Sequence, residues 1–163
     1  MMVRSFNSSL LTRRTTLKEL GFYLEGLLEL CERESVIFFK TGLYTLQFVN
    51  VSECNIHGLD FSFPDAGWSR DYFDLIRRSF SSEGIEYVVR PLEDGEIPRF
   101  LDVGNLDLAT AKKVTLIAMN ALPPCEDDLE VEYKGSWLRR PSRKYLRSRF
   151  LAMSLELQDQ GSL

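Results

Sequence analysis

The sequence of 163 residues has little of what identifies enzymes, secreted scaffolds or membrane proteins, because it contains one histidine, three cysteines and no long apolar run. The cysteines are odd in number and far apart, which argues against the disulfide framework of a small secreted domain. No apolar run approaches the roughly 20 residues that span a bilayer, and the first residues lack the apolar core of a signal peptide. These absences predict a cytoplasmic protein that does not enter the membrane.

Catalytic and cofactor motifs are also missing. Neither G-x-G-x-x-G nor G-x-x-x-x-G-K-[ST] occurs, so a phosphate-binding loop is not supported, and no G-x-S-x-G elbow is present. His57 follows Cys54 by three residues, whereas catalytic Cys–His pairs normally converge from distant positions. The same two residues lack the further ligands that a zinc site needs. We therefore predict no catalytic residue, no cofactor and no metal.

Acidic residues cluster in residues 58–74 and leave one enzyme hypothesis open. A carboxylate-based active site around Asp60, Asp65 and His57 would require these side chains to converge in a cleft. The simpler interpretation of the cluster is a solvated turn followed by the first turns of a helix. The carboxylate enzyme is therefore kept as the alternative from a different functional class.

The distribution of charge separates the last part of the chain from the rest. The net charge is −4, but residues 136–163 carry +4 and the preceding 135 residues carry −8. An acidic protein is a poor match for the phosphates of nucleic acid, which bind Lys and Arg. The charge instead favours a basic protein as the partner.

Hydrophobic periodicity predicts the first half of the fold. Residues 16–33 follow a helical pattern, and Thr16 with Glu19 resembles a capping box. Residues 36–51 are typical of a β-hairpin that turns at Thr41–Gly42. A third strand is expected at 58–63, and Ser69 is placed to begin a helix over residues 70–82.

The second half is also expected to consist of strands followed by a helix. Strands are expected at 85–91 and 97–103, and a helix that begins at Asn105 or Asp107 should end near Leu122. Residues 129–137 are expected to add an edge strand whose Glu130 and Glu132 face water. An amphipathic helix is expected over residues 142–157, with its basic residues in the first half.

These elements predict a single α+β domain. Its antiparallel sheet would have four to six strands with helices on one face, in the order αββ(β)αββα(β)α. Residues 1–15 would form a flexible arm and residues 16–137 the domain. The basic helix within residues 138–163 would pack on the domain, dock on a partner or form a homo-oligomer.

The acidic and aromatic segments suggest a binding surface. Trp68 lies in a loop between a strand and a helix, where it is either an exposed anchor for a partner or a lid over the core. The predicted partner-binding residues are Asp60, Asp65, Trp68, Asp71, Glu126, Asp127, Asp128, Glu130 and Glu132. We expect a non-catalytic protein-interaction domain, most concretely an immunity-type inhibitor of a basic partner such as a toxin. A secretion-type chaperone is the alternative, and it should show a large apolar groove or a dimer interface.

Overall fold

The computed structural model describes residues 11–53, 58–91, 99–123 and 129–135. These residues form one α+β domain with three helices and a seven-stranded antiparallel sheet. The helices are α1 (Leu20–Leu30), α2 (Arg70–Ser82) and α3 (Leu108–Ala121), and a 3-10 turn, η1 (Leu17–Glu19), precedes α1. The strands are β1 (Leu11–Arg14), β2 (Val36–Thr41), β3 (Tyr44–Asn50), β4 (Leu59–Pro64), β5 (Val88–Pro91), β6 (Arg99–Leu106) and β7 (Leu129–Lys134). The predicted fold class is confirmed.

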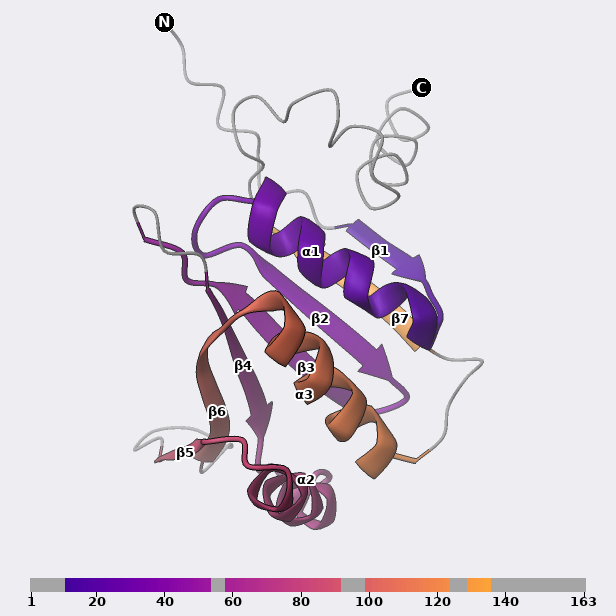
Figure 1. Cartoon of the computed structure of the whole chain (residues 1–163). Helices are drawn as coiled ribbons and strands as arrows, with labels where there is room; N and C mark the ends of the chain where they lie inside the picture. The colour runs from indigo at the N-terminus through magenta and orange to yellow at the C-terminus, as the bar shows by residue number, and fades with distance from the viewer. Residues whose placement is uncertain (1–10, 54–57, 92–98, 124–128, 136–163) are drawn as a thin grey trace, which may run out of the picture.

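The sheet has the strand order β1-β7-β2-β3-β4-β6-β5, and every neighbouring pair is antiparallel. The helices α1 and α3 lie side by side across one face of the sheet, and α2 lies at the end of β4 (Figure 1). The opposite face, which we call the open face, carries none of the described helices. None of the described helices is long and apolar enough to cross a membrane.

The sheet has more strands than the four to six expected, because residues Leu11–Arg14 form strand β1. The sequence predicts a flexible arm here instead, since four residues show too little alternation to indicate a strand. The pairing of β1 with β7 also places β7 between β1 and β2, so the prediction of an edge strand there was wrong. The expected alternation of β7 is present, with Glu130 and Glu132 on the open face.

Alternating burial in the central strands produces the core. The inward residues of β2, β3 and β4 are fully buried, and their neighbours in sequence are half-buried on the open face. Aromatic rings connect the sheet to α2, since Phe48 and Phe61 lie 5.3 Å apart and Phe61 and Phe80 lie 5.7 Å apart between centroids. Such tilted and edge-on contacts are the geometry that aromatic rings prefer.

Some of the predicted turn and cap residues take the predicted role and others do not. Gly42 has a φ of +59° in the β2–β3 turn, as the hairpin prediction requires. Asp107 is the cap of α3 and accepts a hydrogen bond from the Thr110 N–H at 2.7 Å. The Thr16 side chain makes no cap bond, and the Thr15 hydroxyl instead donates to the Glu19 carboxylate at 3.1 Å. Strand β5 begins at Val88, three residues later than expected.

Candidate protein-binding site

Aromatic side chains gather at one corner of the domain, where the β2–β3 turn meets the beginning of α2, and of these Tyr44 and Tyr72 are half-buried against the core. The Tyr44 ring lies 6.0 Å from Trp68 and 4.8 Å from Tyr72, the latter edge to face. Trp68 is 44% exposed, and Leu43 in the adjacent turn is 77% exposed. We call Leu43, Tyr44, Trp68 and Tyr72 the aromatic corner. The exposure of Trp68 favours the anchor over the lid among the two expected roles.

A buried carboxylate fixes the loop that carries Trp68. The Asp65 side chain is only 3% exposed, and its Oδ2 accepts a hydrogen bond from the Arg99 Nε at 2.5 Å. Its Oδ1 lies 3.7 Å from the Arg70 Nε. The Asp65 N–H also donates to the Arg99 carbonyl at 2.9 Å, and the Arg99 guanidinium lies 4.6 Å from the centre of the Phe73 ring. The loop is therefore tied to β6 and α2 at once.

Ser69 closes the same loop from its other end. Its hydroxyl donates to the Pro64 carbonyl at 2.6 Å and accepts from the Ala66 N–H at 2.8 Å. Ser69 stands at the expected position before α2, but its side chain bonds to the loop and makes no bond to the first turn of the helix. The loop that carries Trp68 is thus held by its own hydrogen bonds, and a surface that is fixed in advance loses less entropy on binding.

The predicted binding residues separate into two surfaces. Trp68 and the exposed Asp71 lie at the aromatic corner, with Asp65 buried beneath them, where its carboxylate serves the internal ion pairs. Asp60, Glu130 and Glu132 lie on the open face instead. Glu126, Asp127 and Asp128 lie outside the described residues.

On the open face, two of these three carboxylates already form a hydrogen bond or an ion pair within the domain. Asp60 accepts a hydrogen bond from the Asn105 N–H at 2.9 Å. Glu132 forms an ion pair with Lys40, which comes from the neighbouring strand β2. These carboxylates are half-buried, so they offer less charge to a partner than the sequence suggested.

The residues of the enzyme hypothesis do not share a cleft in the described part of the chain. Asp60 lies on β4, and Asp65 follows the end of that strand, so five residues of extended chain place them about 16 Å apart. His57 lies outside the described residues. Among the residues that the structure describes, no three His, Cys, Asp or Glu side chains are close enough to hold a metal ion.

The Cys31 thiol lies in the core and is not a ready nucleophile. It is 3% exposed at the end of α1. Burial raises the pKa of Cys31 to about 12, although a hydrogen bond with Tyr133 acts in the opposite direction. Burial also raises the pKa of Tyr133, and the adjacent Cys31 adds to that effect. Since the thiolate is the reactive form, Cys31 stays protonated and inert near neutral pH.

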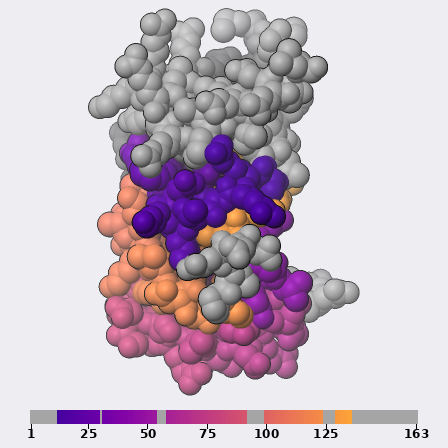
Figure 2. Space-filling model, turned by 90° about the vertical axis from the view of Figure 1, so that its right-hand side faces the viewer, coloured from indigo at the N-terminus to yellow at the C-terminus, as the bar shows by residue number. Residues whose placement is uncertain are grey.

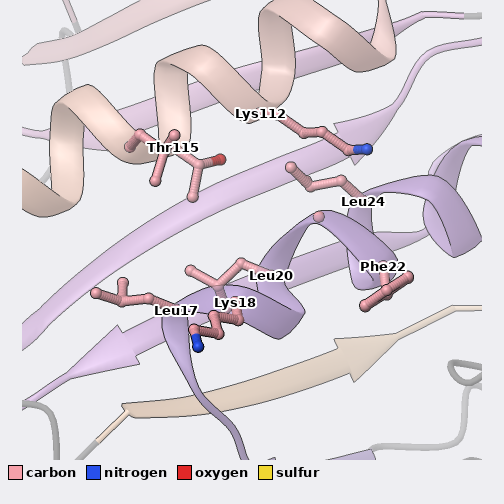
Figure 3. Close-up of a pocket in the computed structure, with 9 residues that line it drawn as sticks. Leu17, Lys18, Leu20, Phe22, Leu24, Lys112 and Thr115 are labelled. Carbon is pink, nitrogen blue, oxygen red and sulfur yellow. The ribbon is translucent and has the colours of Figure 1, made fainter.

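Two hollows lie on the helical side. One, of about 300 Å³, lies between α1 and α3, and the other, of about 490 Å³, lies between α2 and α3. In the space-filling view, the indigo residues of β1 and α1 lie beside the orange residues of α3, with the magenta residues around α2 below them (Figure 2). Leu20 and Leu24 from α1 face Lys112 and Thr115 from α3 across the first hollow (Figure 3).

Sequence reasoning missed part of the aromatic corner. The hairpin pattern of residues 36–51 does not indicate that the Tyr44 ring contacts Trp68 and Tyr72. A partial signal is nevertheless present at position 43, because Leu43 follows Gly42 in a two-residue turn and so lies outside the paired strands. The partnership of Arg99 with Asp65 carries no local signal, since 34 residues separate them.

Comparison with known proteins gives no relative from which a function could be inferred. No family model matches the chain, and neither a curated protein nor a solved structure gives a significant match. The functional argument therefore depends on the geometry of the described residues.

Proposed function

We propose that this chain is a non-catalytic protein-interaction domain, most concretely an immunity-type inhibitor that binds a basic partner in the cytoplasm. The observation that carries the proposal is the aromatic corner. Trp and Tyr supply much of the binding energy in protein interfaces, where they act as anchors in a partner's pockets. Here Trp68 is exposed beside the Tyr44 ring, on a loop already fixed by Asp65 and Ser69.

Charge supports a basic partner. The first 135 residues carry a net charge of −8, and Asp71 lies exposed three residues after Trp68. Long-range attraction between an acidic protein and a basic one raises the association rate, and it weakens as salt is added. In this proposal the rings supply the lasting contact and the net charge speeds the encounter.

The secretion-type chaperone is the second candidate, and the apolar hollow between α1 and α3 is the observation that favours it. Leu17 and Leu116 line this hollow and are 41% and 53% exposed. The second hollow contains Leu75 but lies on the other side of α3. We rank the inhibitor first because it needs one compact surface, whereas a chaperone needs one large continuous apolar groove.

The carboxylate enzyme stays the alternative from another class. It requires Asp60, Asp65 and His57 to act together. The separation of Asp60 from Asp65 and the ion pair between Asp65 and Arg99 both favour the interaction domain over this alternative.

The test is affinity capture from the native cell lysate with three forms of the full chain: wild type, Trp68→Ala and Leu75→Ala. Leu75 is a matched control because it lies on α2, directly after the loop of Trp68, is 39% exposed and is outside the aromatic corner. We expect one basic protein with wild type and with Leu75→Ala. Loss of an interface Trp should weaken its binding by about thirtyfold.

The captured protein then supplies the functional assay. If it is a toxin, adding wild-type chain should inhibit its activity at a one-to-one ratio, and Trp68→Ala should inhibit it only at higher concentration. Recovery of many unfolded or apolar proteins would favour the chaperone. Equal capture by Trp68→Ala and wild type would contradict the role of the aromatic corner.

A further inference from the structure

The groove between η1–α1 and α3 is an apolar channel with lysines beside it. Leu17, Leu20 and Leu24 line one side, and Leu116 lines the other. Lys112 lies across Gly21, where an added Cβ would come within 2.9 Å of the Lys112 Cε. Neither Lys18 nor Lys112 forms an ion pair within the described part of the chain.

Charge changes sign along α1. Lys18 lies in the turn η1 before it, Glu25 and Glu29 follow one helical turn apart within it, and Glu32 lies just after its end. These three carboxylates also lack an ion pair with any residue that the structure describes. A ligand that lies along α1 would therefore need positive charge at one end and negative charge at the other.

The chain itself leaves the sheet at the acidic end of α1. Lys134, at the end of β7, pairs with Val36, at the beginning of β2. Gly135 lies against Ser35, which follows α1 by only five residues. Gly135 therefore lies at the end of α1 that carries Glu32, whose carbonyl accepts a hydrogen bond from the Ser35 N–H at 3.2 Å.

Residues 142–157 have the charge order that this groove requires, although they lie outside the described residues. At helical spacing, Leu146, Phe150, Met153 and Leu157 fall on one stripe. Arg143, Lys144, Arg147 and Arg149 lie in the first half, and Glu156 lies near the end. As a helix the segment would be about 24 Å long, against about 21 Å for Leu17–Leu30.

We propose that residues 142–157 dock in cis as a helix on this groove, antiparallel to α1. The basic half would lie beside Glu25, Glu29 and Glu32, and Glu156 would approach Lys18. The apolar stripe would cover Leu17 and Leu116. The six residues from 136 to 141 can extend about 20 Å, which is enough to reach the groove from Gly135. This inference is independent of the aromatic corner, which lies beyond α3.

Hydrogen–deuterium exchange of the full chain tests the docking. We expect amides in residues 146–157 to exchange at least about tenfold more slowly than in a synthetic peptide of that sequence. Leu116→Asp should remove this protection, because it places a charge under the apolar stripe. Leu75→Asp is the matched control, since it puts the same charge on an exposed leucine outside the groove and should preserve the protection.

A charge exchange tests the direction of the helix. Lys18→Glu should lower the protection of residues 146–157, and adding Glu156→Lys should restore it. Lys113→Glu is the control, because Lys113 pairs with Glu83 on the other side of α3. Failure of the double variant to recover protection would overturn the proposed direction.

Two other results would overturn the proposal itself. Free exchange of residues 146–157 in the wild-type chain would show that the segment does not dock. Protection that rises with protein concentration would show that it docks on a second copy. Either result leaves the partner-binding test of Trp68 unaffected, so the two proposals fail separately.

Discussion

Two arginine–aspartate pairs in this domain have almost the same geometry in different surroundings. Arg99 with Asp65 and Arg90 with Asp102 each have an Nε–Oδ2 distance of 2.5 Å. Each guanidinium also lies over a phenylalanine ring, at 4.6 Å for Arg99 and 4.8 Å for Arg90. The aspartates differ, because the Asp65 side chain is 3% exposed beneath the aromatic corner and that of Asp102 is 25% exposed on the open face.

Burial, rather than distance, should decide what each pair does. Water can replace Arg90 as a partner of Asp102, which also accepts a hydrogen bond from the Ser62 hydroxyl at 2.7 Å. The buried carboxylate of Asp65 has no such replacement. The pair at the corner therefore holds the Trp68 loop in place, whereas the pair on the open face contributes little.

The largest expected effect is that of Arg99→Met, which leaves the Asp65 carboxylate buried beside only the more distant Arg70. We expect the free energy of unfolding to fall by about 3 kcal/mol. The matched change Arg90→Met should lower it by at most about 1 kcal/mol. Urea denaturation of the wild type and both variants measures the difference.

Salt sharpens this comparison. The small loss in Arg90→Met should shrink as the salt concentration rises, because exposed charges are screened. The loss in Arg99→Met should persist. Equal losses in the two variants, or equal salt dependence, would show that burial does not distinguish the pairs.

Two serines allow the same comparison between a buried and a half-buried site for uncharged side chains. Ser69→Ala removes two hydrogen bonds from the buried loop, so we expect a loss of about 1.5 kcal/mol in unfolding free energy. Ser62→Ala removes one bond on the open face and should cost about 0.5 kcal/mol. Thermal or urea unfolding checks both. A loss in Ser62→Ala that exceeds the loss in Ser69→Ala would contradict the account.

The sequence predicted the fold well where the signal was local. The hairpin over 36–51 depends on alternating residues and on Gly42, and the start of α3 depends on Asp107, so neighbouring residues suffice for both. The position of β7 could not be predicted in this way, because it depends on pairing with Leu11–Arg14, more than one hundred residues earlier.

The candidate site was predicted less well for a related reason. Trp68 and Asp71 were identified by residue type and are exposed at the corner. Asp65 belongs to the same acidic cluster in the sequence, yet Arg99 pairs with it inside the protein. Composition identifies a carboxylate but not its distant partner, so it cannot distinguish a docking charge from an internal one.

Burial of the Cys31 thiol should also make the free energy of unfolding depend on pH. Burial raises the pKa of the Cys31 thiol to about 12 from its ordinary value of 9.0, so the unfolded chain loses this proton at lower pH than the folded one. The stability contributed by the protonated thiol is complete below pH 9 and is lost as the pH rises toward 12. We expect about 1 kcal/mol of this loss between pH 9 and pH 10.

Denaturation of the wild type and Cys31→Ala across this pH range checks the expectation. The variant is less stable at neutral pH, but its stability should fall less steeply above pH 9. Identical slopes in the two proteins would show that the thiol does not contribute to the alkaline loss.

The effect of Trp68→Ala on stability should be as small as that of Ser62→Ala. Trp68 is 44% exposed and its ring contact is with Tyr44, so the free energy of unfolding should fall by about 0.5 kcal/mol. Thermal unfolding measures this. A fall above about 3 kcal/mol, the usual cost of truncating a core aromatic residue, would identify Trp68 as a lid over the core.

The measurement that tests the central claim most directly is the affinity of the captured basic partner for Trp68→Ala and for Glu130→Gln. These residues represent the two surfaces, because Trp68 lies at the aromatic corner and Glu130 on the open face. The account predicts about thirtyfold weaker binding for Trp68→Ala and less than about threefold for Glu130→Gln. Unchanged binding by Trp68→Ala together with a large loss for Glu130→Gln would move the binding site to the open face and contradict the account.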